Sequence, residues 1–316
     1  MSNGDVMNGK PIRQIALIGF GEVGGIFGQD FAAAGLNVST YDILLNAEPA
    51  RSAMLAKAKG ANVRACDTLE EAVRGADLVI SAVTASSAAG VAIDAAPFLR
   101  AGQIYLDINS VSPDTKLSIA RSLGASPATF VEAAVMAPVA PQRIKSPMLL
   151  GGADAASAAE RLGAIGMNVK PISERIGVAS AIKMCRSIII KGLEAITVES
   201  MFTARRYGAE KQVLESLAAT YPGMGWDGAL PDYLISRVAE HGKRRAAEMR
   251  EAAQAVADAG LEPLTALATA QRQDWLAHVI ADFSLAFPKG EKFVWQELAD
   301  AIAKTLSEAE EPAQKT

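Results

Sequence analysis

The feature that most constrains the fold is a short apolar run that leads directly into a glycine-rich turn. Residues 15–18 are Ile-Ala-Leu-Ile, and residues 19–24 follow as Gly-Phe-Gly-Glu-Val-Gly, a Gly-x-Gly-x-x-Gly pattern. An alanine-rich stretch comes next, so the pattern stands between an expected strand and an expected helix. In such a turn the first glycine allows a tight bend, the second lets backbone approach a pyrophosphate, and the third lets helix pack against strand. The sequence therefore predicts that the chain begins with a Rossmann-type dinucleotide-binding unit.

The turn itself is the first part of the expected cofactor site, because free N–H groups at a helix N-terminus favour a bound anion. The turn residues expected to bind the cofactor are Gly19, Phe20, Gly21, Glu22, Val23 and Gly24. At the end of the next expected strand, Asp42 is placed to bind the adenosine ribose hydroxyls and to repel a 2′-phosphate. This favours NAD over NADP.

Alternatives remain open for the rest of the cofactor site. Asp42 has a second interpretation, as a cap for the helix that follows, and Arg51 is close enough in sequence to serve a 2′-phosphate. Val83 and Thr84 end a later strand and are expected to border the nicotinamide pocket, with a simple turn as the alternative.

Short β-type runs alternate with alanine-rich helical stretches through the first half of the chain. Strands separated by helices predict βαβ units and a mostly parallel sheet. Helices are expected near residues 24–34, 47–59, 68–74, 86–99 and 113–122. The expected strands are Gln14–Gly19, Asn37–Tyr41, Leu78–Val83, Ile104–Asp107, Thr129–Ala134 and Met148–Gly151.

The second half of the chain is expected to be helical, with no strand after Pro171. From Gly177 to Tyr207 proline is absent and apolar residues recur at helical spacing, which predicts one helix of about 30 residues, roughly 45 Å long. The expected fold class is thus an α/β Rossmann domain at 12–172, a long connecting helix at 173–207 and an all-α substrate or dimerisation domain at 208–307. The polar ends, 1–11 and 308–316, are expected to be disordered tails.

Composition excludes several classes of function. The formal net charge of −4 gives no electrostatic reason to expect nucleic acid as a partner. The chain holds two cysteines and two histidines, so we expect neither a disulfide framework nor a zinc or other metal site. No apolar run reaches the ~20 residues that a spanning helix needs, so we expect no membrane contact and a cytoplasmic location.

The long expected helix offers a group that handles protons. Lys183 lies in its first turns, and at ~100° per residue Ser187, Ile190 and Glu194 fall on the same side. A half-buried lysine has a destabilised ammonium form and can shuttle a proton. A lysine that only extends to water or pairs with Glu194 is the alternative, and chemistry alone favours neither interpretation over the other.

The whole layout resembles the β-hydroxyacid dehydrogenases, the superfamily that includes 3-hydroxyisobutyrate and 6-phosphogluconate dehydrogenases, over residues 12 to about 300. The resemblance rests on the N-terminal glycine motif, on the segment from Leu106 to Pro113, and on Gly177 followed by Lys183. It implies an NAD(P)-dependent oxidoreductase that transfers hydride at the hydroxyl-bearing carbon of a hydroxy acid or alcohol, with Lys183 as general acid/base. It also implies a small-molecule substrate bound by Asn109, at the place of the family's serine, and by Ser110.

The sequence also departs from the family pattern. Met136, Ala137 and Pro138 stand where the family usually has Ser-Gly-Gly, and proline removes an N–H donor. Ser187 stands where the family has asparagine. Met136, Ala137 and Ser187 are still expected to line the substrate site, so the chain is expected to be a divergent branch with its own type of helical C-terminal domain.

Further interpretations stay open. His241 is a weaker candidate for substrate binding, and a solvated helix histidine is the favoured alternative. An imine reductase-like enzyme shares the expected architecture but generally lacks the lysine, and a non-catalytic NAD-binding sensor belongs to another class. Because a helix this long with apolar residues on several faces needs cover, we expect a homodimer or a larger homo-oligomer.

Overall fold

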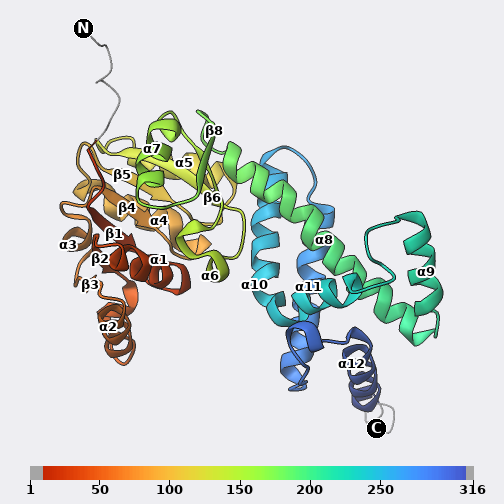
Figure 1. Ribbon diagram of the computed structural model, residues 1–316. Coiled ribbons are helices and arrows are strands. Elements are labelled where there is room, and N and C mark those ends of the chain that lie inside the picture. The colour runs from red at the N-terminus through yellow and green to blue at the C-terminus, as the bar shows by residue number, and fades with distance from the viewer. Residues whose placement is uncertain (1–9, 311–316) are drawn as a thin grey trace. The chain divides into compact units, whose positions relative to one another are not determined.

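The structure is a computed structural model that describes residues 10–310 of the 316-residue chain (Figure 1). The chain divides into two compact units, one ending at Lys183 and the other beginning at Met184. The boundary falls inside the long helix α8 (Val178–Arg206), so each unit holds a part of this helix. Residues 1–9 and 311–316, parts of the two expected tails, lie outside the described residues.

Within the described residues, the first unit is built on an eight-stranded sheet of order β3-β2-β1-β4-β5-β6-β7-β8. All neighbouring strands are parallel except β6 and β7. The first six follow the Rossmann order 3-2-1-4-5-6, whose topological switch point lies between β1 and β4. The predicted fold class, a mostly parallel α/β sheet followed by a long helix and helical elements, is confirmed. The strands are β1 (Gln14–Ile18), β2 (Asn37–Tyr41), β3 (Arg64–Ala65), β4 (Leu78–Ser81), β5 (Ile104–Asp107), β6 (Thr129–Val135), β7 (Met148–Gly151) and β8 (Val169–Ser173).

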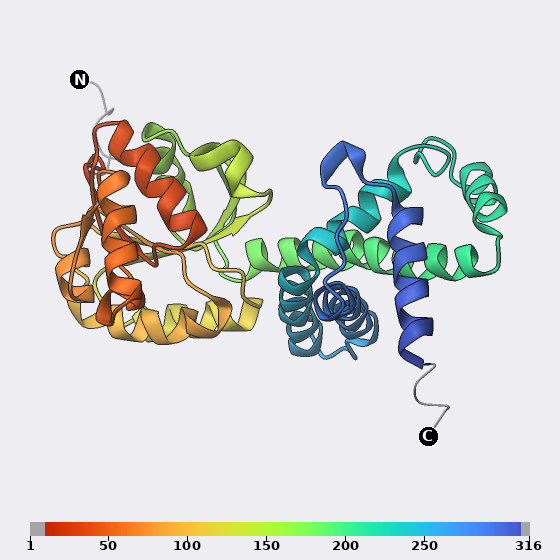
Figure 2. The same cartoon turned by 90° about the horizontal axis from the view of Figure 1, so that it is seen from below.

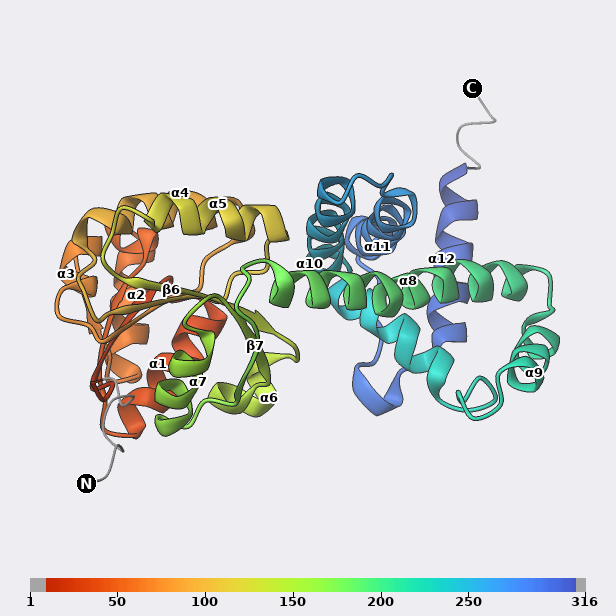
Figure 3. The same cartoon turned by 90° about the horizontal axis from the view of Figure 1, so that it is seen from above.

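Helices cover both faces of this sheet, with α4 and α5 on one side and α1 and α7 on the other (Figure 3). One core contains Phe27 and Phe31 from α1 (Glu22–Ala33), with residues of α2 (Ala50–Gly60) and α7 (Ala155–Ala164). The other contains residues of α3 (Leu69–Val73), α4 (Ala88–Ala95) and α5 (Pro113–Leu123). Because both faces are covered, the central strands are continuous apolar runs rather than alternating ones.

The second unit consists of the rest of α8 with α9 (Glu210–Thr220), α10 (Leu230–Asp258), α11 (Leu264–Asp282) and α12 (Trp295–Glu310). Here α12 crosses α8 (Figure 2), and Trp295 packs in one core with Val198 and Met201 of α8. α10 and α11 approach closely, since a Cβ at Gly242 would lie 2.7 Å from the carbonyl oxygen of Gln273. Among the helices of residues 10–310, none has the length and apolarity to span a bilayer.

Several elements differ from those expected. The edge strand β8 contains Pro171, which an edge tolerates because the missing N–H would face outward. β3 has two residues, too few for a pattern, and α7 was not expected. α12 continues to Glu310, so residues 308–310 are helical rather than part of a tail. At the other end, the Lys10 ammonium pairs with the Asp77 carboxylate at 2.9 Å, so residue 10 is anchored and not part of a free tail.

Candidate active site

The glycine turn lies at the switch point, where the carboxyl ends of β1 and β4 meet. Gly19 has a φ of +90°, and a Cβ there would lie 2.4 Å from the carbonyl oxygen of Ala82, directly after β4. A Cβ at Gly24 would lie 2.1 Å from the carbonyl oxygen of Gly19. At Gly21, by contrast, a Cβ would meet nothing within 4 Å. Packing therefore requires Gly19 and Gly24, while Gly21 borders open space of the kind that a pyrophosphate would occupy.

Helix α1 starts in this turn and has no side-chain cap at its N-cap residue, Gly21. The first N–H groups of a helix have no acceptor within the helix, and the helix dipole adds positive potential at this end. The backbone of Glu22, Val23 and Gly24 therefore suits a bound anion, as expected for a dinucleotide pyrophosphate.

Asp42 directly follows β2 and is buried beside the turn. Its Oδ2 accepts a hydrogen bond from the Phe20 N–H at 2.7 Å, and its Oδ1 accepts one from the Leu44 N–H at 3.0 Å. The second bond caps a short 3-10 turn, which was the alternative interpretation of Asp42. Since each carboxylate oxygen has two lone pairs, both retain acceptor capacity for ribose hydroxyls.

Arg51, the candidate for a 2′-phosphate, is engaged within the protein. Its guanidinium donates to the carbonyl oxygen of Leu45 at 2.6 Å and pairs with the Asp67 carboxylate at 2.8 Å. These contacts give Arg51 a structural task in the segment that follows β2.

Lys57 of α2 is a contact of the glycine turn that sequence reasoning missed. Its Nζ donates to the carbonyl oxygens of Phe20 and Gly21, each at 2.6 Å, and lies 5.2 Å from the centroid of the Phe20 ring. The absent side chain of Gly25 makes room, because a Cβ there would lie 2.8 Å from Cε of Lys57. Lys57 is 36 residues from Gly21 and belongs to no motif, so only the folded structure reveals the contact.

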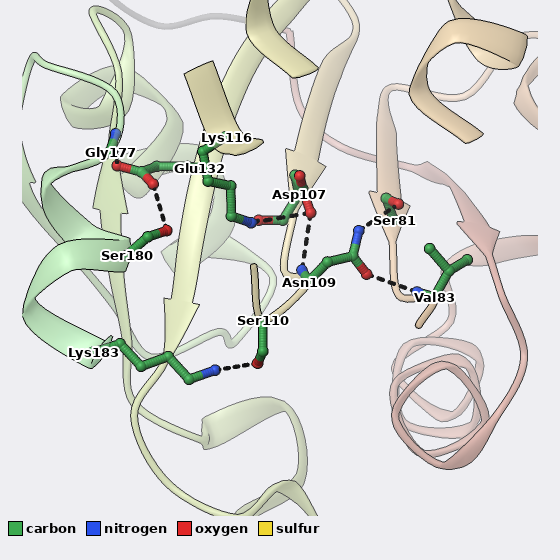
Figure 4. A network of polar contacts seen from close by, with 10 residues as sticks. All are labelled: Ser81, Val83, Asp107, Asn109, Ser110, Lys116, Glu132, Gly177, Ser180 and Lys183. Atoms are coloured by element: carbon green, nitrogen blue, oxygen red, sulfur yellow. Dashed lines mark hydrogen bonds and ion pairs between the residues drawn. The ribbon is translucent and has the colours of Figure 1, made fainter. Parts of the chain in front are cut away.

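Asn109 joins the ends of β5 and β4 (Figure 4). Its amide donates to the Ser81 hydroxyl at 2.9 Å and accepts from the Val83 N–H at 2.7 Å, and its own N–H donates to Oδ1 of Asp107. The side chain is buried and holds the two loops together, and substrate binding by Asn109 stays a prediction. Thr84, which follows Val83, forms hydrogen bonds with the hydroxyls of neighbouring serines at the surface.

A fully buried ion pair supports the same loop from behind. Lys116 of α5 lies 3.1 Å from Oδ1 of Asp107 and donates to the Asp107 carbonyl oxygen at 2.9 Å. Their side chains are 0% and 1% exposed. These two contacts join α5 to the loop after β5, while Oδ2 of Asp107 is buried with no hydrogen-bond partner among the described residues.

The loop presents Ser110 to the long helix. Lys183, in the early turns of α8, donates from Nζ to the Ser110 hydroxyl oxygen, and both residues are half-buried (Figure 4). The alternative partner, Glu194, lies 3.1 Å from the guanidinium of Arg245 instead. The structure thus brings together two of the predicted site residues, Lys183 and Ser110.

Glu132 of β6 is the second residue that sequence reasoning missed. Its fully buried carboxylate accepts from the N–H groups of Gly177 and Ala179 and from the Ser180 hydroxyl, at the start of α8. The signal in the sequence is a charged residue within a mostly apolar strand.

The remaining predicted substrate residues are placed less simply. The N–H of Met136 donates to the carbonyl oxygen of Pro147 at 2.9 Å, which extends the pairing of β6 with β7. Met136 and Ala137 are half-buried, and Pro138 is the N-cap of the short helix α6 (Val139–Gln142). The Met136 N–H is therefore already hydrogen-bonded within the protein, so Met136 could contact a substrate only through its side chain.

Ser187 and His241 belong to the second unit. The Ser187 hydroxyl accepts from Nζ of Lys191 at 3.4 Å, and Lys191 pairs with Glu248 at 2.5 Å. His241 is half-buried on α10, where burial lowers its pKa and the charges of Arg237 and Arg244 lower it further. Substrate binding by Ser187 and by His241 stays a prediction.

Comparison with known proteins agrees with this geometry. The family model described as the NAD binding domain of 6-phosphogluconate dehydrogenase matches residues 14–172, and a domain of unknown function matches residues 204–276. An uncharacterized 28.5 kDa protein from Methanothermus fervidus is 30% identical over 255 residues, which is 79% of this chain and 94% of that protein.

Solved structures extend the likeness over both units. The crystal structure of a conserved hypothetical protein from Sinorhizobium meliloti 1021 shares 36% identity, with a TM-score of 0.75 over 89% of this chain and 92% of the other. A conserved protein of unknown function, described as structurally similar to 3-hydroxyacid dehydrogenases, shares 29% identity, with a TM-score of 0.70 over 86% of this chain and all of the other. A Mycobacterium tuberculosis 3-hydroxyisobutyrate dehydrogenase solved with L-serine shares the fold at 18% identity, with a TM-score of 0.65 over 92% of this chain and 99% of the other.

Proposed function

Since the chain belongs to the 6-phosphogluconate dehydrogenase-like family of β-hydroxyacid dehydrogenases, we propose that it transfers hydride between a nicotinamide cofactor and a hydroxyl-bearing carbon. The substrate would be a small hydroxy acid or alcohol. The observation that carries the proposal is the contact between Lys183 and Ser110 on the same edge of the sheet as the glycine turn.

The chain's own groups supply a cofactor site of the right chemistry. The turn from Gly19 to Gly24 would hold the pyrophosphate, and Asp42 the adenosine ribose, with Val83 and Thr84 near the nicotinamide. The bound nicotinamide accepts or supplies the hydride. NAD is favoured over NADP because an acid directly follows β2 and because Arg51 already binds Leu45 and Asp67.

Proton transfer falls to the Lys183 amine. Hydride cannot leave an alcohol carbon efficiently unless the hydroxyl proton leaves as well, and a positioned base takes that proton. In the reverse direction the ammonium returns a proton to the carbonyl oxygen. The Ser110 hydroxyl accepts from Lys183 and would meet the substrate oxygen, so the substrate would lie among Ser110, the 134–138 loop and the first turns of α8.

The first experiment is a screen of hydroxy acids, polyols and aryl alcohols with NAD and NADP, and of carbonyl compounds and imines with the reduced cofactors. Turnover of a hydroxyl or carbonyl compound supports the proposal. Turnover of imines alone would assign the enzyme to imine reduction. Cofactor binding without turnover of any compound would make the protein a sensor.

The second experiment tests Lys183 in the active assay. Lys183→Ala and Lys183→Met are expected to lower kcat by about 10²–10⁴-fold, since that is what a positioned acid/base contributes. NADH affinity should stay within about threefold, because Lys183 does not belong to the glycine turn. Lys183→Arg is the matched control, since arginine keeps the charge but does not release its proton. A near-normal rate in Lys183→Arg would reduce the lysine to an electrostatic anchor, and a near-normal rate in Lys183→Ala would refute the acid/base role.

A further inference from the structure

A buried carboxylate meets the start of the helix that carries Lys183. Oε1 of Glu132 accepts from the N–H of Gly177 at 2.6 Å and from the N–H of Ala179 at 3.2 Å, and Oε2 accepts from the Ser180 hydroxyl at 2.8 Å. Glu132 is 0% exposed, and all three bonds are buried. Figure 4 shows Glu132 with two of its partners, Gly177 and Ser180.

The surroundings of Glu132 accommodate this arrangement. Gly151 of β7 pairs with Glu132 in the sheet, and a Cβ at Gly151 would lie 2.4 Å from Oε1 of Glu132. Gly177, with a φ of +95°, makes the turn that brings the chain from β8 into α8. The strands that hold Glu132 and Gly151 and the turn at Gly177 together leave room for the Glu132 carboxylate to reach the N-terminus of α8.

A carboxylate suits this place on electrostatic grounds. The first N–H groups of a helix lack acceptors within the helix, and its N-terminus carries the equivalent of about half a positive charge. A buried helix start has no water to satisfy these groups, so an acceptor must come from the protein. Glu132 supplies both the acceptors and the opposite charge.

The contact between Glu132 and the start of α8 lies close in sequence to Lys183, which connects it to the proposed catalysis. Lys183 follows Ser180 by about one helical turn, and the orientation of the first turn fixes the direction of its side chain. On the opposite side of the contact, the loop of Ser110 is held by Asn109 and by the Asp107–Lys116 pair. We propose that Glu132 is a positioning residue, which holds the first turn of α8 so that the Lys183 amine stays at the Ser110 hydroxyl. This inference rests on the proposed function, because it acts through Lys183.

The chain offers variants that separate the parts of the contact. Glu132→Gln removes the charge but keeps an acceptor oxygen for the two N–H groups, while Glu132→Ala removes both. Ser180→Ala removes only the third bond. Asp77→Asn is a matched control, because Asp77 is another buried carboxylate of the first unit, which accepts from the N–H groups of Arg13 and Gln14 far from α8 in sequence.

Amide hydrogen exchange measures the contact without any substrate. In Glu132→Ala, exchange at Gly177–Ser180 should become about tenfold faster, since loss of a helix cap changes the local opening equilibrium about 2- to 30-fold. Glu132→Gln should restore part of the protection, and Asp77→Asn should leave it unchanged. If Glu132→Ala does not fold, Ser180→Ala makes the same comparison, with an expected increase of about threefold.

Kinetics measure the consequence for Lys183. Glu132→Ala should lower kcat about 10- to 100-fold, because small displacements of a catalytic group reduce the rate steeply, while KM and NADH affinity stay within about threefold. In a Lys183→Ala background the same substitution should have no further effect on kcat, since the two residues act as one unit.

Three results would each overturn the positioning role. The first is unchanged amide exchange at the start of α8 in Glu132→Ala, and the second is an equal loss of kcat in Asp77→Asn. The third is an additive effect of Glu132→Ala and Lys183→Ala on kcat. Normal turnover in Lys183→Ala alone would overturn the proposed function instead. The exchange measurement would in that case still report whether Glu132 caps α8, so the two failures are distinguishable.

Discussion

Substitution of two glycines of the cofactor turn should affect cofactor binding and protein stability differently. A Cβ at Gly24 would lie 2.1 Å from the carbonyl oxygen of Gly19, so helix or strand backbone must move to admit it. Overpacking of this kind typically costs 1–3 kcal/mol, and the backbone position of the clash puts Gly24→Ala at about 3 kcal/mol. At Gly21 a Cβ meets nothing within 4 Å, and alanine is a poorer N-cap residue than glycine, so Gly21→Ala should lower the free energy of unfolding by about 1 kcal/mol.

The methyl group of Gly21→Ala would occupy the space through which the backbone approaches the pyrophosphate. We expect the Kd for NADH to rise at least about 100-fold, which corresponds to about 2.8 kcal/mol at 1.4 kcal/mol per tenfold. Urea unfolding measures the stability of each variant, and NADH fluorescence titration measures binding. A Gly21→Ala protein that binds NADH within threefold of wild type would refute the placement of the cofactor on this turn. Wild-type stability in Gly24→Ala would refute the packing argument.

Three other predictions concern different parts of the chain. We expect tighter binding of NADH than of NADPH because of Asp42, and equal or tighter NADPH binding in a fluorescence titration would contradict this. Ile182, Ile189 and Ile196 follow one another at seven-residue spacing on α8 and are 41%, 74% and 59% exposed, so we expect a dimer or larger oligomer that Ile189→Asp weakens. Sedimentation as a stable 33.0 kDa monomer at working concentration would exclude it. Burial raises the pKa of Glu194 to about 7 from 4.5, so the stability that its proton provides is full below pH 4.5 and is lost as the pH rises through 7. Between pH 5 and pH 8 this group should lower the free energy of unfolding by about 2–3 kcal/mol, and an unfolding series in which Glu194→Gln shows the same loss as wild type would disprove the linkage.

The sheet was largely predictable because its signals are local. Strands β1, β2, β4, β5, β6 and β7 were all expected within two residues of their observed ends, since each is a compact apolar run between helical stretches. The two strands that were missed lack such a run. β3 has two residues, and β8 contains Pro171, which is acceptable only because the strand lies at an edge that the sequence does not announce.

The candidate site was predictable where a motif carries it and not where tertiary contacts do. The glycine turn follows from a local pattern, and Lys183 and Ser110 follow from the family motifs that their segments resemble. Glu132 and Lys57 meet their partners from 45 and 36 residues away, and no local spacing encodes such contacts. Asn109 shows a further difficulty, because the sequence identifies a polar residue at the right place but not whether its amide faces a ligand or the protein.

The three most deeply buried charged residues in the described part of the first unit, Asp107, Lys116 and Glu132, support the two sides of one contact. A buried ion pair is often no more stabilising than apolar residues of similar volume, so the Asp107–Lys116 pair has little reason to exist for stability alone. The same holds for the Glu132 carboxylate within an apolar strand. What both groups do is restrict geometry: the ion pair holds the loop of Ser110, and Glu132 holds the first turn of Lys183's helix. A serine and a lysine that meet between two such supports are held in place before any substrate arrives, which is the condition under which a proton-transfer group acts efficiently.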